Sequence, residues 1–131
     1  MNILLDSSAI ISYLRGNEEL RNIIESADEV LTSSLCAYEV LEGENYSRIK
    51  RNRTGNEVAT FLEDTTIVPL DRKDAEIAAE AQARLMVKGL EQNAIDVLIG
   101  ASAVRNEVEL ITRDGDYGVM QEVLGLKFRK V

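Results

Sequence analysis

The sequence contains no histidine. This absence excludes Ser-His-Asp and Cys-His catalytic centres, histidine-ligated zinc sites and acid–base catalysis by an imidazole. Catalysis by this chain would therefore depend mainly on carboxylates, lysine, tyrosine or bound metal ions.

Cysteine is almost as scarce, with a single residue at position 36. One cysteine forms no disulfide within the chain, which fits a reducing, cytoplasmic compartment. Because its neighbours Leu35 and Ala37 are apolar or small, we expect Cys36 to be a buried, inert thiol rather than a nucleophile.

Long apolar runs are missing too, since no segment approaches the roughly 20 residues of a membrane-spanning helix. The first residues lack the basic region of a signal peptide and reach an acid at position 6. The single proline argues against long irregular linkers. At 131 residues, 45% of them hydrophobic, the sequence predicts one domain over 1–131 with its own core and no membrane partner.

Acidic residues outnumber basic ones by 23 to 15, which gives a net charge of −8. Such a balance argues against a general nucleic-acid binder, because these proteins usually present a basic surface. Local charge matters more than the total, however. Acids gathered around a metal ion would account for much of the excess.

Apolar runs alternate with helical patterns along the chain. Strands are predicted at 2–5, 29–32, 66–70, 109–112 and 126–129. Helices are predicted from the caps Asp6-Ser7-Ser8 to Leu14, over 18–26, from Ser33-Ser34 to about Glu42, from a capping box at 54–57 to about Glu63, from Asp71 through Met86 to an end at Gly89, from Asn93 to about Arg105, and over 118–123. This order predicts an α/β fold, with a central, mostly parallel five-stranded sheet and helices on both faces.

Two acids follow strands of this predicted sheet. Asp6 comes directly after the first strand, and Asp114 lies just beyond the fourth. In open parallel sheets ligands bind outside the carboxyl ends of the strands, so both carboxylates reach one crevice if these strands are neighbours. Each acid also has an ordinary structural role open to it, Asp6 as a helix N-cap and Asp114 as a turn residue.

Asp96 is part of segment 95–104, which is apolar nearly all round and is therefore predicted to be buried. A buried carboxylate is costly without hydrogen bonds, a counter-charge or a metal. The alternative is a capping role, with Asn93 as N-cap and Asp96 at the third helical position. Glu39 has apolar neighbours and is expected to be partly shielded, although a solvated glutamate is the commoner case.

Together these acids indicate a metal site better than any one of them does alone. Carboxylates that are packed together repel one another, and their pKa values rise unless a cation holds them. Mg²⁺ or Mn²⁺ prefers oxygen ligands, with waters completing the shell. Such an ion lowers the pKa of a bound water and stabilises charge on a phosphate.

Four segments carry a resemblance to a known family: ILLDSSAIISYL at the start, SSLCAYEVLEG, NAIDVLIGASA, and LITRDGDYGV near the end. In this order and context they resemble the four acidic motifs of the PIN-domain nucleases. The resemblance spans nearly the whole chain and is closest to VapC-type toxins of toxin–antitoxin pairs.

The resemblance implies a metal-dependent endoribonuclease with one or two Mg²⁺ or Mn²⁺ ions held by Asp6, Glu39, Asp96 and Asp114. Asp116 matches a further supporting acid, and Ser7 matches a small hydroxyl residue beside the first acid. The resemblance further implies an RNA substrate cut to a 5′-phosphate and a 3′-hydroxyl, homodimerisation and inhibition by a cognate antitoxin. Two positions depart from the pattern without removing a ligand: Gly100 replaces a usual alanine, and the loop before Asp96 lacks a frequent proline.

Basic residues cluster in segment 47–53 of this otherwise acidic chain. As candidate RNA contacts they would hold phosphates, although such a run is more often a solvated helix end. Arg113, next to Asp114, would either steady a phosphate or pair with the site carboxylates. The tyrosines at 13, 38 and 117 are interpreted as packing residues rather than base-stacking platforms. The candidate RNA contacts are Arg48, Lys50, Arg51, Arg53 and Arg113.

Three other functions are alternatives to a toxin nuclease. The first is a PIN nuclease that processes RNA without a toxin role. The second is a receiver-like signalling domain, which requires paired acids after the first strand, where only Asp6 stands, and an acceptor after the third, where Asp71 is better explained as an N-cap. The third is a PIN scaffold that only binds, although such a protein has no reason to keep buried charges.

Overall fold

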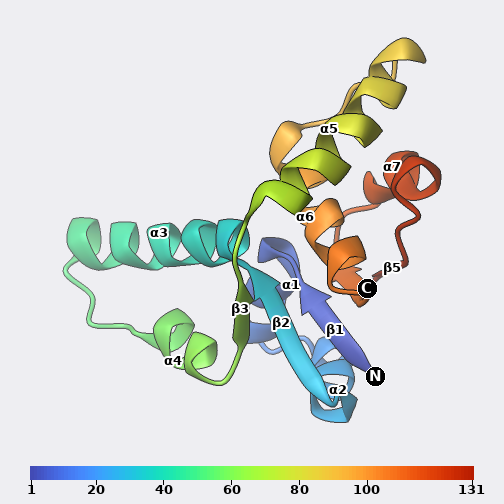
Figure 1. The fold of residues 1–131 in the computed structure, drawn as a ribbon. Helices are drawn as coiled ribbons and strands as arrows, with labels where there is room; N and C mark the ends of the chain where they lie inside the picture. Colours follow the sequence, from blue (N-terminus) through green and yellow to red (C-terminus); the bar gives the residue numbers. More distant parts are fainter.

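A five-stranded sheet runs through the centre of the protein, and all of its strand pairs are parallel (Figure 1). The computed structural model describes every residue from 1 to 131. The order across the sheet is β3-β2-β1-β4-β5. Its strands are β1 (Asn2–Leu5), β2 (Glu29–Ser33), β3 (Thr66–Val68), β4 (Glu109–Thr112) and β5 (Phe128–Lys130). The predicted α/β fold with five strands is confirmed, and the sheet is wholly parallel.

Seven helices connect or follow the strands. They are α1 (Ser7–Leu14), α2 (Glu18–Ser26), α3 (Ser34–Arg51), α4 (Glu57–Glu63), α5 (Arg72–Val87), α6 (Ala94–Arg105) and α7 (Tyr117–Leu124). None of them combines the length and apolar character needed to span a bilayer.

The helices lie on both faces of the sheet, as predicted, because successive side chains of each strand point to opposite faces. Leu4 and Leu110 belong to a core cluster that includes residues of α5, α6 and α7. Ile3, Leu5 and Ile111 belong to a second cluster with residues of α1, α2, α3 and α4. The two cores are separated by the sheet, and both depend on β1 and β4, in which all but the first residue of each strand are buried.

Helix α3 is longer than the sequence predicted, since it continues through Gly43 to Arg51. The predicted end near Glu42, just before Gly43, was therefore wrong. A glycine inside an exposed helix costs only about 1 kcal/mol, which does not end a helix by itself. The helix ends instead at Asn52, which adopts a left-handed conformation with φ 52°. In Figure 1 the far end of α3 stands clear of the sheet.

The predicted capping box at 54–57 was also wrong. Helix α4 begins at Glu57, and Asn56 at its N-cap makes no side-chain cap bond. The carboxylate of Glu44, in α3, instead accepts hydrogen bonds from the backbone N–H groups of Val58 (2.8 Å) and Ala59 (3.3 Å). A contact between distant parts of the chain thus replaces the local cap.

Three smaller boundary predictions also need correction. Strand β3 ends at Val68 rather than at 70, since Pro69 has no N–H to continue the ladder. Strand β5 begins two residues later than predicted, and α7 includes Tyr117 and Leu124. The caps Asp6, Asp71 and Asn93 are confirmed, each accepting backbone N–H groups of its own helix.

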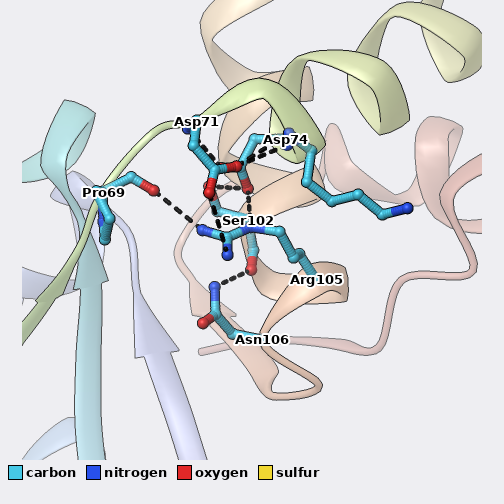
Figure 2. A network of polar contacts seen from close by, with 7 residues as sticks. Pro69, Asp71, Asp74, Ser102, Arg105 and Asn106 are labelled. Atoms are coloured by element: carbon cyan, nitrogen blue, oxygen red, sulfur yellow. Dashed lines mark hydrogen bonds and ion pairs between the residues drawn. The ribbon is translucent and has the colours of Figure 1, made fainter.

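Helices α5 and α6 are joined by a buried ion pair between Asp74 and Arg105 (Figure 2). The Arg105 Nε donates to Asp74 Oδ1 at 2.8 Å, and Ser102 Oγ donates to the same oxygen at 3.2 Å. Arg105 also donates to the carbonyl of Pro69. Burial alone would raise the pKa of Asp74, but the hydrogen bond from Arg105, the backbone N–H of Asp71 and the arginine charge together lower it.

Replacing Arg105 by alanine would leave the fully buried Asp74 without its counter-charge. We predict that Arg105→Ala lowers the free energy of unfolding at pH 7 by about 3 kcal/mol, measured by urea denaturation. The folded-state pKa of Asp74 lies below its unfolded value, so the ion pair stabilises above about pH 4 and this contribution is lost as the pH falls. The difference between the two proteins should therefore narrow in acid.

Arg84→Ala is the matched control, because Arg84 pairs with Glu80 on the exposed surface of α5. Its effect should stay within about 0.5 kcal/mol. Equal losses for the two variants at pH 7 would contradict a special role of the buried pair.

Candidate functional site

A cavity of about 140 Å³ lies at the carboxyl ends of β1 and β4 and brings together four acids. The two strands are neighbours in the sheet, as the sequence argument required. Asp6 directly follows β1, Asp114 lies two residues beyond β4, and Glu39 and Asp96 come from α3 and α6. The remaining lining residues are Ser7, Ser8, Ile99 and Tyr117. The structure therefore gathers all four predicted acids in one place.

Asp6 is buried, with 5% of its surface exposed, and both of its carboxylate oxygens accept hydrogen bonds. Oδ1 accepts from Ser8 Oγ (2.7 Å) and from the backbone N–H of Ala9 (2.9 Å), and Oδ2 accepts from Thr112 Oγ1 (2.5 Å). Burial nevertheless raises the pKa of Asp6 more than these bonds lower it. Asp6 is thus both the N-cap of α1 and part of the cavity wall.

The loop after β4 is tied to Asp6 through two hydroxyl groups. Thr112 Oγ1, which donates to Asp6, accepts the backbone N–H of Asp114 at 2.9 Å. Ser8 Oγ likewise accepts the backbone N–H of Arg113 at 3.1 Å. Neither Ser8 nor Thr112 was among the predicted site residues. The only available signal was a hydroxyl residue at the buried end of β4, and its role depends on β1 and β4 being neighbours.

Glu39 is exposed, contrary to the expectation that its apolar neighbours would partly shield it. Only one face of α3 packs against the sheet, and Cys36 and Val40 occupy that face. The side chain of Glu39 is still held at the cavity, because Ser7 Oγ donates to its Oε1 at 2.7 Å. Ser7 therefore lies beside the site, as predicted. Cys36 is fully buried, as expected.

Asp96 is half-buried, so the expectation of a fully buried carboxylate was too strong. Asn93 caps α6, and its side chain accepts the backbone N–H of Asp96, which stands at the third helical position. The capping arrangement and the cavity position occur together. Burial, followed by the charges of Asp114, Asp6 and Glu39, raises the pKa of Asp96.

Asp116 does not line the cavity but lies at its edge. Its side chain is exposed, and its backbone N–H donates to Asp114 Oδ1 at 2.8 Å. Its negative charge also contributes to the raised pKa of Asp96.

Arg113 is exposed and makes no ion pair with the site carboxylates. Of the other candidate RNA contacts, three form the exposed last turn of α3 and the fourth follows its C-cap: Arg48, Lys50, Arg51 and Arg53. The preferred interpretation of this run as a solvated helix end agrees with its position. Phosphate binding by these residues stays a prediction.

The donor set fits a hard divalent cation in kind, since the cavity offers carboxylate oxygens that repel one another. As the side chains stand, however, no three of the acids are arranged to hold a metal ion. Magnesium commonly keeps several waters and uses only one or two carboxylates, so an incomplete protein cage is compatible with it. A larger hollow of about 480 Å³ lies beside Asn2 and Glu109, at the amino ends of β1 and β4, and gathers no comparable set of acids.

A family model for the PIN domain matches residues 3–123 of this chain. The chain belongs to the PIN-domain family. PIN-domain proteins are nucleases and generally use divalent metal ions, so the acids at the strand ends have a known chemical context. No curated protein matches the sequence.

Several solved structures share this fold at low sequence identity. VapBC2 from Rickettsia felis, bound to a DNA fragment from its promoter, is 19% identical with a TM-score of 0.83, over 100% of this chain and 99% of that chain. FitAcB from Neisseria gonorrhoeae is 23% identical with a TM-score of 0.74, over 96% and 95%. VapC20 from Mycobacterium tuberculosis, a toxin that cleaves the sarcin–ricin loop, is 16% identical with a TM-score of 0.59, over 88% and 92%. At these identities the likeness shows the fold alone.

The raised pKa of Asp96 yields a test on the metal-free PIN domain. A folded-state pKa above the unfolded one means that stability is lost as the pH rises through the ordinary aspartate range. We predict that Asp96→Asn raises the free energy of unfolding at pH 7, and that the gain disappears below about pH 4. Denaturant titrations across this pH range measure the difference.

Glu18→Gln is the matched control, because Glu18 is an exposed acid in the first turn of α2. Its removal should cost about 0.3 to 1 kcal/mol through the helix dipole. A loss of stability in Asp96→Asn of the same size would mean that capping outweighs the repulsion among the carboxylates.

Proposed function

We propose that this PIN domain is an endoribonuclease that depends on Mg²⁺ or Mn²⁺ and hydrolyses RNA phosphodiester bonds. The observation that carries the proposal is the convergence of Asp6, Glu39, Asp96 and Asp114 on one cavity. Burial, followed by repulsion from neighbouring acids, raises the pKa values of Asp6 and Asp96, and no basic side chain pairs with either carboxylate. A divalent ion would supply that charge and activate a water for attack on phosphorus.

The residues of the chain have separate tasks in this proposal. Asp6, Glu39, Asp96 and Asp114 would hold one or two ions, with Asp116 supporting them from the edge of the cavity. Ser7 orients Glu39, while Thr112 orients Asp6. These hydrogen bonds fix which carboxylate lone pairs remain free to face an ion.

Positive charge for the RNA would come from outside the cavity. Arg48 and Arg51 lie about 14 to 18 Å along α3 from Glu39, at 1.5 Å per residue. Lys50 Nζ stands 5.7 Å from the centre of the Tyr46 ring, so an aromatic face and cations share this end of the helix. Together with Lys50, Arg53 and Arg113, these residues would contact phosphates beyond the scissile bond.

We further propose that the protein is a cytoplasmic toxin of a VapBC-type pair, with a homodimeric form and a cognate antitoxin as partner. VapBC and FitAB complexes are among the structures with this fold. The second candidate is a PIN nuclease of RNA processing, which has the same cavity and no antitoxin. A small antitoxin gene beside this one would favour the toxin.

The receiver-like alternative loses its support. Asp71 caps α5 through its side chain and follows β3, which is an edge strand separated from β1 by β2. It therefore does not line the cavity that contains Asp6.

Two carboxylate-to-amide substitutions test the proposed activity. We predict that Asp6→Asn and Asp96→Asn each lower metal-dependent RNA cleavage by at least about 100-fold, because each removes a charged ligand of the ion. EDTA should abolish cleavage by the wild-type protein. Cleavage of a labelled RNA is measured beside circular dichroism spectra, which verify the fold.

Asp64→Asn is the control, because Asp64 is exposed and precedes the amino end of β3. The cavity lies at the carboxyl ends of β1 and β4. This variant should cleave at the wild-type rate. Undiminished cleavage by folded Asp6→Asn or Asp96→Asn would refute the assignment.

A further inference from the structure

Tyr117 has an unusual hydroxyl group. Its side chain is 1% exposed, and its oxygen is the one buried side-chain nitrogen or oxygen that has no hydrogen-bond partner. Leaving a buried polar group unpaired is costly, and native proteins usually satisfy such groups with protein or ordered water. A phenylalanine would fill the same space without this cost.

Tyr117 lies beside the acidic cavity, and its hydroxyl is close enough to Asp6, Asp96 and Asp114 to respond to their charges. Tyr117 is the first residue of α7, directly after the loop that carries Asp114, and it lines the cavity. Its side chain belongs to an apolar core cluster, and the Phe128 ring centroid lies 6.3 Å from its own. The carboxylates of Asp6, Asp96 and Asp114 are close enough to add, after burial, to a raised pKa of Tyr117. The group therefore stays protonated and able to donate a hydrogen bond at neutral pH.

Among the side chains that line the cavity, Tyr117 has the only hydroxyl that is not already donating. Ser7 donates to Glu39 and Ser8 donates to Asp6. Carboxylates are acceptors only when they are ionised, and Ile99 has no polar atom. A water in this cavity could donate hydrogen bonds to many groups. Among the lining side chains, only the Tyr117 hydroxyl would be free to donate a hydrogen bond to it.

We propose that the Tyr117 hydroxyl donates a hydrogen bond to a water of the divalent ion's shell in the carboxylate cavity. The inference rests on the proposed metal-dependent function. The bond turns the two protons of that water towards the carboxylates, so Tyr117 is a positioning residue for the ion. The missing partner in the metal-free protein is then explained, because the partner arrives with the hydrated metal.

Tyr117→Phe removes the hydroxyl and keeps the ring. Mn²⁺ binding is measured by electron paramagnetic resonance on the protein without RNA, and melting temperatures are recorded with and without Mn²⁺. We expect about tenfold weaker Mn²⁺ binding, the usual size of an effect transmitted through a ligand's neighbour. We also expect the metal-free variant to melt at or above the wild-type temperature, because an unpaired buried hydroxyl has been removed.

Tyr13→Phe is the matched control, since Tyr13 is partly buried against Phe61 and lines a different hollow. It should bind Mn²⁺ as the wild type does. Unchanged Mn²⁺ binding by Tyr117→Phe would overturn the inference, as would an equal loss in Tyr13→Phe. Normal Mn²⁺ binding with weakened RNA binding would also overturn it, since the hydroxyl would then serve the phosphate. If wild type and Asp96→Asn bind Mn²⁺ equally, the metal site itself is refuted, and the inference falls with it.

Discussion

The geometry of the cavity depends on the hydrogen bonds that the Asp6 carboxylate accepts. This carboxylate accepts the N-terminal N–H of α1 on one oxygen and the Thr112 hydroxyl on the other. Thr112 in turn fixes the backbone of Asp114. One buried acid therefore fixes the position of the loop that carries Asp114, once β1 and β4 are paired. Without this carboxylate, the strand ends would still be neighbours, but the Thr112 hydroxyl that holds the backbone of Asp114 would lose its acceptor.

This arrangement has an electrostatic cost that the rest of the fold must offset. The pKa values of Asp6 and Asp96 are both raised, so ionisation at neutral pH works against folding. Helix α6 carries Asp96 at its N-terminal end and is anchored at its C-terminal end by the ion pair of Arg105 with Asp74. The ion pair thus holds the C-terminal end of α6, while Asp96 at its N-terminal end lies near the other acids. Such a site gains most from a bound cation, because the ion relieves repulsion that the fold maintains.

Much of the fold was predictable because its signals are local. Asp6, Asp71 and Asn93 cap helices through their own side chains, and β1, α2 and β4 have the predicted bounds. Asp6 and Asp114 could be predicted to converge because parallel strands end at one edge of the sheet, whereas Glu39 and Asp96 were added by the resemblance to the PIN-domain nucleases. Long-range contacts were the part that local patterns do not encode. Glu44 replaces the expected cap of α4 from across the chain, and α3 passes through Gly43.

The same contrast between local signals and long-range contacts applies to the site. Asp6 and Asp114 follow strands and were found from their positions, whereas Thr112 and Tyr117 acquire their importance only once β1 and β4 are paired. Exposure was also misjudged at Glu39, since apolar sequence neighbours on a helix point to different faces.

The central claim is that the carboxylate cavity binds a divalent ion, and a crystal structure grown with Mn²⁺ tests it most directly. Anomalous scattering locates manganese without reference to any assumed ligand. The account predicts a peak in the cavity, in contact with Asp96 and at least one of Asp6 and Asp114, and its loss in Asp96→Asn crystals. A cavity that holds only water at saturating Mn²⁺, or a peak at another acidic surface, would contradict it.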